Sequence, residues 1–207
     1  ADSSTSGRTN ARGCAVSDHP FQHVAFEPIG RDDLNACLSS WKHRMGELRR
    51  PTRGWNHGLR HGDELIAVVA TDTLIRPRVA GFDRRQAIEL SRLCAVRPDI
   101  CRVALRLWRL FVFPAIAQER GCNWAISYQD TALHSGALYR FDGWVRLGVS
   151  RSGVDPRTGR RGRSKVIWGW CDDPVLRRRA RPFLPEQSLT CDGYDPAGRD
   201  LRGISLL

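Results

Sequence analysis

The chain lacks any run of about 18 apolar residues, so the sequence predicts no membrane-spanning helix. The opening stretch ADSSTSGRTNARG has no apolar core and is not typical of a secretory signal peptide. We interpret residues 1–20 as a disordered leader. No internal repeat is visible in the sequence. A chain of 207 residues suits a single domain that is large enough to bury a core.

Cysteine pairs are also missing. The seven cysteines are scattered, and no two of them form a C-x-x-C motif. Their odd number and spacing argue against a disulfide framework and against a zinc knuckle. We therefore expect reduced thiols in a cytoplasmic protein.

Lysine is almost absent, although the chain is strongly basic. Of 33 basic residues only Lys42 and Lys165 are lysines, and the net charge is +11 with a pI near 10.2. A GC-rich genome would explain arginine in place of lysine, but it does not explain the excess over acidic residues. Because arginine presents a planar fork of donors that suits phosphate, this excess predicts a polyanionic partner, namely DNA.

Hydrophobic spacing predicts strands and helices in alternation. We expect strands at 21–29, near 55–59, after a turn at 61–63, and then at 86–96, 123–128, 144–150 and 165–170. Shorter helices are expected at 31–45, with Asp32 and Asp33 as cap candidates, and at 133–143. The longest helical pattern covers 97–121, with Asp99 as its expected N-cap, a kink or break at Pro114, and Gly121 as its end.

This layout is typical of an α+β domain with a mixed central sheet flanked by helices. The order of the elements resembles that of the GNAT acetyltransferase fold, which we assign to residues 21–170. Residues 171–207 are predicted to be a basic, loop-rich C-terminal extension. The resemblance implies that strand 86–96 is the fourth strand of the fold. It also implies that the next helix points its N-terminus toward the pyrophosphate of acetyl-coenzyme A or a related acyl donor.

The junction between this strand and helix is expected to hold the donor. The candidate cofactor-binding residues are Cys94, Val96, Arg97 and Arg102. The GNAT signature at this junction is Q/R-x-x-G-x-G/A, whereas this chain has RPDICR at residues 97–102 and lacks both glycines. An ordinary capped core helix is therefore an alternative interpretation of this stretch.

The segment SYQDTALHSGALYRFDGW, residues 127–144, contains the strongest catalytic candidates. Asp130 closes a strand and Tyr139 follows nine residues later in the next helix. A carboxylate can accept the proton of an attacking amine, and a phenol can protonate a leaving group. The alternative is that Asp130 caps the helix and that Tyr139 belongs to the core. We expect Phe141 and Trp144 to be core aromatics.

The motifs E-L-x-R-L and S-Y-x-D, followed by G-x-x-Y and W-x-x-x-G, resemble the Mom family over roughly residues 40–150. The matching residues are Glu89, Leu90, Arg92, Leu93, Ser127, Tyr128, Asp130, Gly136, Tyr139, Trp144 and Gly148. Mom proteins are phage DNA-modification enzymes that convert adenine to an N6-carbamoylmethyl form. The resemblance implies catalytic roles for Arg92, Asp130 and Tyr139, and for His43 on the first helix.

Two further features bear on partners and metals. The arginine-rich loop at 151–164 is a candidate DNA clamp, with candidate contacts at Arg151, Arg157, Arg160, Arg161, Arg163 and Lys165; a solvated loop is the alternative. His43, His57 and His61 fit no compact ligand spacing, so we assign no metal, although iron has been suggested for Mom-like proteins.

The sequence thus predicts a GNAT-like enzyme that modifies an exocyclic amine of a DNA base, with adenine N6 as the expected target. Such an enzyme must reach a flipped or single-stranded base, and Trp41, Trp55 and Trp168 are candidates to stack on it. One alternative is a conventional acyl-coenzyme A N-acyltransferase that acts on a small amine or a protein. A second is a DNA-binding accessory protein without catalytic activity.

Overall fold

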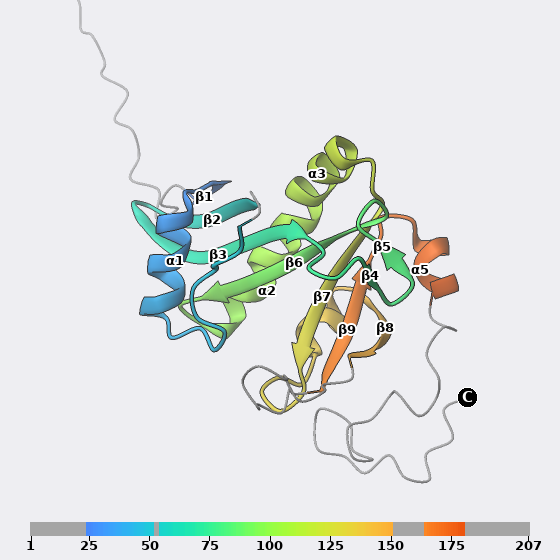
Figure 1. Cartoon of the computed structure of the whole chain (residues 1–207). Helices are drawn as coiled ribbons and strands as arrows, with labels where there is room; N and C mark the ends of the chain where they lie inside the picture. Colours follow the sequence, from blue (N-terminus) through green and yellow to red (C-terminus); the bar gives the residue numbers. More distant parts are fainter. Residues whose placement is uncertain (1–23, 52–53, 151–163, 181–207) are drawn as a thin grey trace, which may run out of the picture.

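The computed structural model describes residues 24–51, 54–150 and 164–180. Seven strands form one mixed sheet in the order β1-β2-β3-β6-β7-β9-β8, and helices lie on both of its faces (Figure 1). The α+β layout with a mixed sheet is therefore confirmed. The strands are β1 (Val24–Pro28), β2 (Trp55–His61), β3 (Glu64–Thr73), β6 (Ala87–Ala95), β7 (Trp124–Asp130), β8 (Val145–Ser150) and β9 (Lys165–Trp170).

One face of the sheet is covered by the long helical segment. It consists of α2 (Pro98–Leu107), the π-helical turn η1 (Trp108–Val112) and α3 (Phe113–Arg120), and it ends at the left-handed Gly121 as expected. The helix continues through Pro114, and the irregularity predicted there takes the form of the π turn just before it. The buried side chains of this segment, with Trp108 at their centre, form the largest core cluster together with β3, β6, β7 and β9.

Two shorter helices pack on the other face of the sheet. Helix α1 (Arg31–Ser40) packs over β2 and β3 and buries Leu34 and Leu38. It is shorter than the predicted 31–45, because the chain turns at Trp41. Helix α5 (Pro174–Ala180) packs near β8 and buries Ala180, in a region where we expected no regular structure.

Two short elements complete the fold. The strands β4 (Arg78–Val79) and β5 (Phe82–Asp83) form a hairpin that the sequence analysis did not find. Helix α4 (Ala137–Phe141) lies between β7 and β8, within the predicted 133–143. Within the described residues no helix is both long and apolar enough to cross a membrane.

Candidate active site

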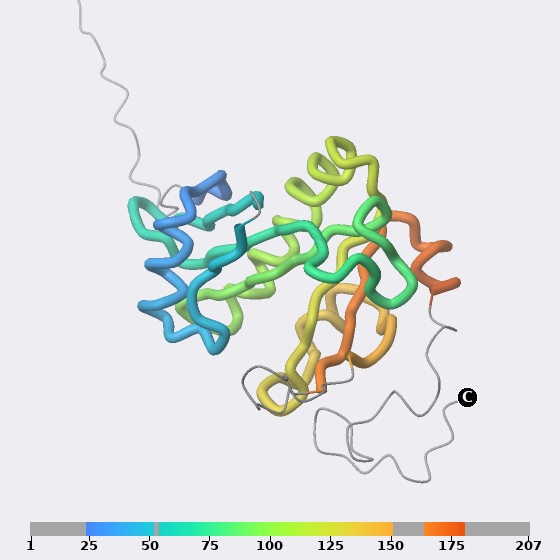
Figure 2. Tube along the Cα trace, in the orientation of Figure 1, coloured from blue at the N-terminus to red at the C-terminus, as the bar shows by residue number. Residues whose placement is uncertain are grey.

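The sheet opens between β6 and β7. These two strands are parallel, but they pair only from Ala87–Leu90 against Trp124–Ser127. Both strands continue past that point, β6 to Ala95 and β7 to Asp130, and they diverge (Figures 1 and 2). Beyond Leu90 and Ser127 the two strands therefore share no ladder hydrogen bonds.

A β-bulge lies where the opening begins. Ala70 of β3 pairs with Arg92 and Thr71 pairs with Leu90, so Ser91 has no partner residue. A bulge of this kind brings two successive side chains to the same face. Consistent with this, the Ser91 hydroxyl donates to an Asp72 carboxylate oxygen at 2.5 Å, on the α1 face.

A cavity of about 1470 Å³ occupies the opening, and we call it the β6–β7 cavity. It collects titratable groups from six parts of the chain: the segment after α1, the segment that leads into and includes β4, β6, α2, the segment from β7 to α4, and β9. Large cavities with convergent polar groups are the usual location of active sites. Of the predicted catalytic residues, it is lined by His43, Arg92, Asp130 and Tyr139.

Buried charges form the cavity floor on the α1 face. Arg50 lies between Glu89, at 2.5 Å, and Asp72, at 3.8 Å. Glu89 is only 4% exposed, and its second oxygen, Oε2, has no hydrogen-bond partner among the described residues. No role for Glu89 was predicted from the sequence. The available signal was a carboxylate between two apolar residues, Ile88 and Leu90, in a buried strand.

Tyr139 approaches the gap from the opposite face. Its hydroxyl lies 2.8 Å from the hydroxyl of Ser127, which in turn donates to the Leu90 carbonyl oxygen. Its ring stacks on Trp168 with centroids 5.5 Å apart. Burial raises the pKa of Tyr139, although Ser127 opposes the shift, so the phenol keeps its proton at neutral pH. Such a group can act as a general acid.

Asp130 holds a turn at the end of β7. Its carboxylate accepts from the Ala132 amide at 3.1 Å, and its carbonyl oxygen accepts from the amides of Leu133 and His134. Because side chains alternate along a strand, Asp130 projects to the face opposite Ser127 and Tyr139. It shares the cavity with Tyr139 but reaches it from the other side of the sheet.

His43 follows α1 in a turn, and its Nδ1 accepts from the Met45 amide at 3.3 Å. Burial, together with the charges of Arg92 and His134, lowers the pKa of His43 to about 4. The imidazole is therefore neutral at pH 7 and is not a general acid there.

The aromatic candidates lie elsewhere. Trp144 is buried as expected, but Phe141 is 67% exposed and stacks against Arg102, so its assignment to the core was wrong. None of Trp41, Trp55 and Trp168 lines the β6–β7 cavity, and Trp168 is buried beneath Tyr139. These positions do not support stacking on a base held in this cavity.

The predicted DNA contacts Arg151, Arg157, Arg160, Arg161 and Arg163 lie outside the described residues. Lys165, the sixth, lines the β6–β7 cavity. The cavity is strongly cationic, because seven basic side chains line it against two carboxylates. The basic residues are Lys42, Arg44, Arg50, Arg76, Arg78, Arg92 and Lys165, and the acids are Glu89 and Asp130.

The N-terminus of α2 does not fit the pyrophosphate of coenzyme A. Arg97 is the N-cap, so the prediction of Asp99 as the cap was wrong. Pro98 has no amide hydrogen, the amide of Ile100 is taken by the Arg97 carbonyl oxygen, and Arg97 pairs with Asp99 at 2.7 Å. Hydrogen bonding to Arg97 lowers the pKa of Asp99, so a negative charge stands where a phosphate would bind.

The other residues predicted to bind the acyl donor do not all lie at the same site. Cys94 is buried and lines the β6–β7 cavity, whereas Val96 and Arg102 are exposed and lie outside its lining. On its β7 side, β6 has no strand partner beyond Leu90 among the described residues. This free edge could pair with an extended donor chain.

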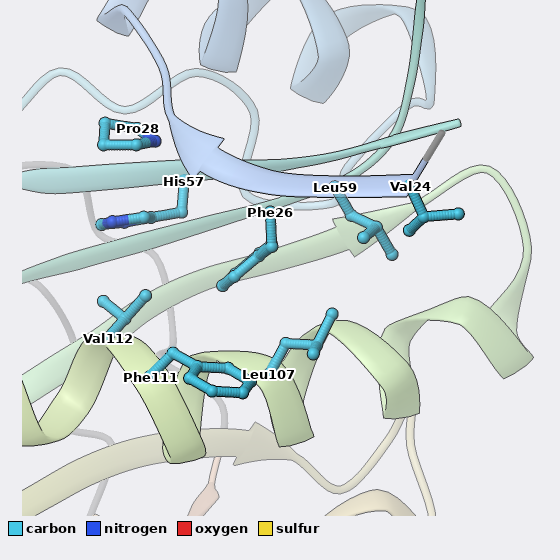
Figure 3. A pocket seen from close by; sticks show the side chains of 8 residues that line it. All are labelled: Val24, Phe26, Pro28, His57, Leu59, Leu107, Phe111 and Val112. Carbon is cyan, nitrogen blue, oxygen red and sulfur yellow. The ribbon is translucent and has the colours of Figure 1, made fainter. Parts of the chain in front are cut away.

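Metal binding has no support within the described part of the chain, where no three His, Cys, Asp or Glu side chains gather. His57 instead lines a separate apolar hollow of about 450 Å³ between β1, β2 and the α2–η1 helix (Figure 3). Apart from this imidazole, all the lining side chains are hydrocarbon, so the hollow offers little catalytic chemistry.

Comparison with solved structures identifies the fold. A probable acetyltransferase from Staphylococcus epidermidis matches with a TM-score of 0.51 and 10% identity, over 73% of this chain and 100% of that chain. The ribosomal-protein-S5-alanine acetyltransferase from Vibrio fischeri matches with a TM-score of 0.51 and 11% identity, over 74% and 96%. A probable GNAT acetyltransferase from Chromobacterium violaceum has 18% identity and a TM-score of 0.48, over 72% and 87%.

The chain therefore has the GNAT fold, as the order of its elements predicted. No family model matches the sequence, and no curated protein matches it. The narrower resemblance to Mom proteins gains no support from these comparisons.

Gly136 provides a test of the turn beside Tyr139. It has φ 71°, and a Cβ there would lie 2.4 Å from Oε1 of Gln129, the atom that accepts from Trp168. Gly121 has φ 64° but open space around it, so it is a matched control. We expect Gly121→Ala to cost about 1–2 kcal/mol from backbone strain. Gly136→Ala should cost about 1–3 kcal/mol more through the broken hydrogen bond. Urea unfolding measures both, and equal losses would contradict the described turn.

The pKa of His43 predicts a dependence of stability on pH. The folded value of about 4 lies below the ordinary 6.5, so the unfolded chain binds the proton more tightly. This contribution to stability is complete above pH 6.5 and is lost as the pH falls toward 4. His43→Asn should therefore reduce the slope of unfolding free energy against pH in this window. A slope identical to that of the unchanged protein would show that His43 is not held neutral.

Proposed function

We propose that the chain is an N-acyltransferase whose acceptor amine binds in the β6–β7 cavity. The observation that carries the proposal is the placement of two groups around one opening in a GNAT sheet. Glu89 reaches it from the α1 face with an unpaired carboxylate oxygen, and Tyr139 reaches it from the α4 face with a protonated phenol. An acceptor and a donor on opposite faces can meet through the gap.

The reaction assigns one proton transfer to each side. As the amine nitrogen attacks the acyl carbon, Glu89 Oε2 accepts the proton that the nitrogen loses. The bond from the acyl carbon to the leaving atom breaks, and Tyr139 donates its proton to that atom. Ser127 orients the phenol through its 2.8 Å contact. Asp130 supports the loop 131–136 that leads into α4.

The proposal does not require coenzyme A as the acyl donor, because the α2 N-terminus does not fit its pyrophosphate. Neither proton transfer, by Glu89 or by Tyr139, involves the pyrophosphate. The free edge of β6 remains available to an extended acyl carrier. An assay must therefore offer acetyl-coenzyme A and also a small thioester without a nucleotide, such as S-acetyl-N-acetylcysteamine.

The test is release of thiol that depends on an added amine, together with the mass of the acylated product. Glu89→Gln and Tyr139→Phe should each lower kcat by about 10²–10⁴-fold, the usual contribution of a general base or acid. Glu64→Gln, an exposed carboxylate at the start of β3, is the matched control and should retain activity. No transfer from either thioester to any amine would refute the proposal. An unchanged kcat in Glu89→Gln would remove Glu89 from it.

A second candidate is the DNA-base modification that the Mom resemblance implies, with adenine N6 as the acceptor amine. Its support is the cationic lining of the β6–β7 cavity and the net charge of +11, both of which favour a phosphate-rich partner.

This second candidate predicts a new adenine adduct when the chain is expressed in a bacterium and the DNA is digested to nucleosides for mass spectrometry. The adduct should disappear in Tyr139→Phe. Binding of the purified chain to DNA should weaken steeply as salt rises. Unmodified nucleosides and salt-independent binding would exclude this candidate.

A further inference from the structure

Two residues that line the β6–β7 cavity each carry a buried polar atom without a hydrogen-bond partner among the described residues. One atom is the acceptor Oε2 of Glu89, and the other is the donor Nε of Arg92. These residues are 4% and 8% exposed. Buried polar groups in folded proteins are nearly always hydrogen-bonded, so an unpaired acceptor and an unpaired donor beside one cavity indicate a ligand that supplies both partners.

Arg92 offers the edge of its guanidinium that best binds an anion. Its Nη1 donates to the Ser91 carbonyl oxygen at 2.8 Å, which fixes one end of the group. The unpaired Nε belongs to the opposite edge, where Nε and Nη2 point in parallel. This edge matches the two oxygens of a carboxylate or a phosphate.

The acids of the cavity floor form their ion pairs with Arg50 and none within 4 Å with Arg92. Arg50 takes the contacts with Glu89 and Asp72, at 2.5 and 3.8 Å. Within the described residues Arg92 has no ion pair within 4 Å. Burial lowers the pKa of Arg92 and the charge of Arg50 lowers it further, while Glu89 and Asp72 oppose the shift. A positive charge in a cavity already lined by other cations is best matched by an anionic group on the ligand.

The two residues are also close enough to hold one small molecule. They lie three positions apart on β6, which is about 10 Å of extended strand, and the bulge at Ser91 keeps both on the α1 face. With their side chains directed into one cavity, they can contact groups separated by a few atoms.

We propose that the acceptor is a small zwitterionic amine that carries a carboxylate or phosphate a few atoms from its nitrogen. The nitrogen lies at Glu89 Oε2, and the anionic oxygens bind the Nε edge of Arg92. This inference rests on the proposed acyltransferase function and names its substrate class.

The experiment compares amines that differ only in the anionic group. β-Alanine is paired with propylamine, and phosphoethanolamine with ethanolamine, so that carboxylate and phosphate are tested separately. We expect the anionic member of at least one pair to have a kcat/KM about 10- to 100-fold higher, mainly through KM, as expected of a hydrogen bond to a charged group. Arg92→Gln should bring the ratio close to one, and Arg92→Lys should restore part of it.

Arg120→Gln, at the exposed end of α3, is the control for loss of one positive charge and should keep the ratio of the unchanged protein. Equal kcat/KM values within both pairs would overturn the inference, as would transfer confined to DNA or to peptides. A ratio that survives Arg92→Gln would also overturn it.

Calorimetric titration with the same four amines separates this inference from the proposed function. Binding that prefers the anionic amines and requires Arg92 would support the inference even if no acyl transfer were found. Acyl transfer without any such preference would support the proposed function alone.

Discussion

The early end of the β6–β7 ladder determines the chemistry available to this fold. After four residue pairs the two parallel strands separate, so the sheet contains an opening instead of a continuous hydrogen-bonded surface. Side chains from both faces, Glu89 on one and Tyr139 on the other, reach the same space only because of that opening. The Ser91 bulge begins at the same level of the sheet and turns Arg92 toward the α1 face. A regular strand would send Arg92 to the face of α2, where the apolar core lies.

The buried charged residues at the floor of the β6–β7 cavity are only partly paired with one another. Arg50 pairs with one oxygen of Glu89 and approaches Oδ2 of Asp72, which also accepts from Ser91, whereas Oδ1 of Asp72 has no hydrogen-bond partner among the described residues. Burying a charged group away from water is unfavourable unless the group is paired. The contacts of Arg50 and Ser91 offset this penalty for most of the buried charged groups, and the remaining penalty falls on the few atoms without a partner. Two of the residues that carry such atoms, Glu89 and Arg92, line the cavity, where unpaired groups can serve binding. The aromatic cluster beneath Tyr139 has the opposite character, because the indoles of Trp168 and Trp144 both find acceptors, in Gln129 and Asp142.

Local patterns in the sequence were sufficient for most elements. Alternation in AIELSRLCA, the long helical face around Trp108 and the stop at Gly121 are each determined by neighbouring residues, and all were predicted. The bulge, the β4–β5 hairpin and the exposure of Phe141 depend on contacts between distant segments, which no local period encodes. The same dependence on distant contacts limited the prediction of the active site. The sequence placed Tyr139, Asp130, Arg92 and His43 at one cavity through motif order. It could not show that Asp130 and Tyr139 lie on different faces, or that Glu89 has an unpaired oxygen.

The position of β9 within the sheet has a consequence for how the chain folds. This strand is formed by residues 165–170, yet it lies between β7 and β8, which precede it in the chain. During synthesis β8 has no neighbour to pair with until residue 170 has left the ribosome, and Trp168 is not yet present to support Tyr139. While residues 131–170 are being synthesised, the nascent chain therefore carries β7 with one unpaired edge, a state prone to aggregation. Completion of the sheet is a late, long-range event, and such non-local pairing is associated with slow folding.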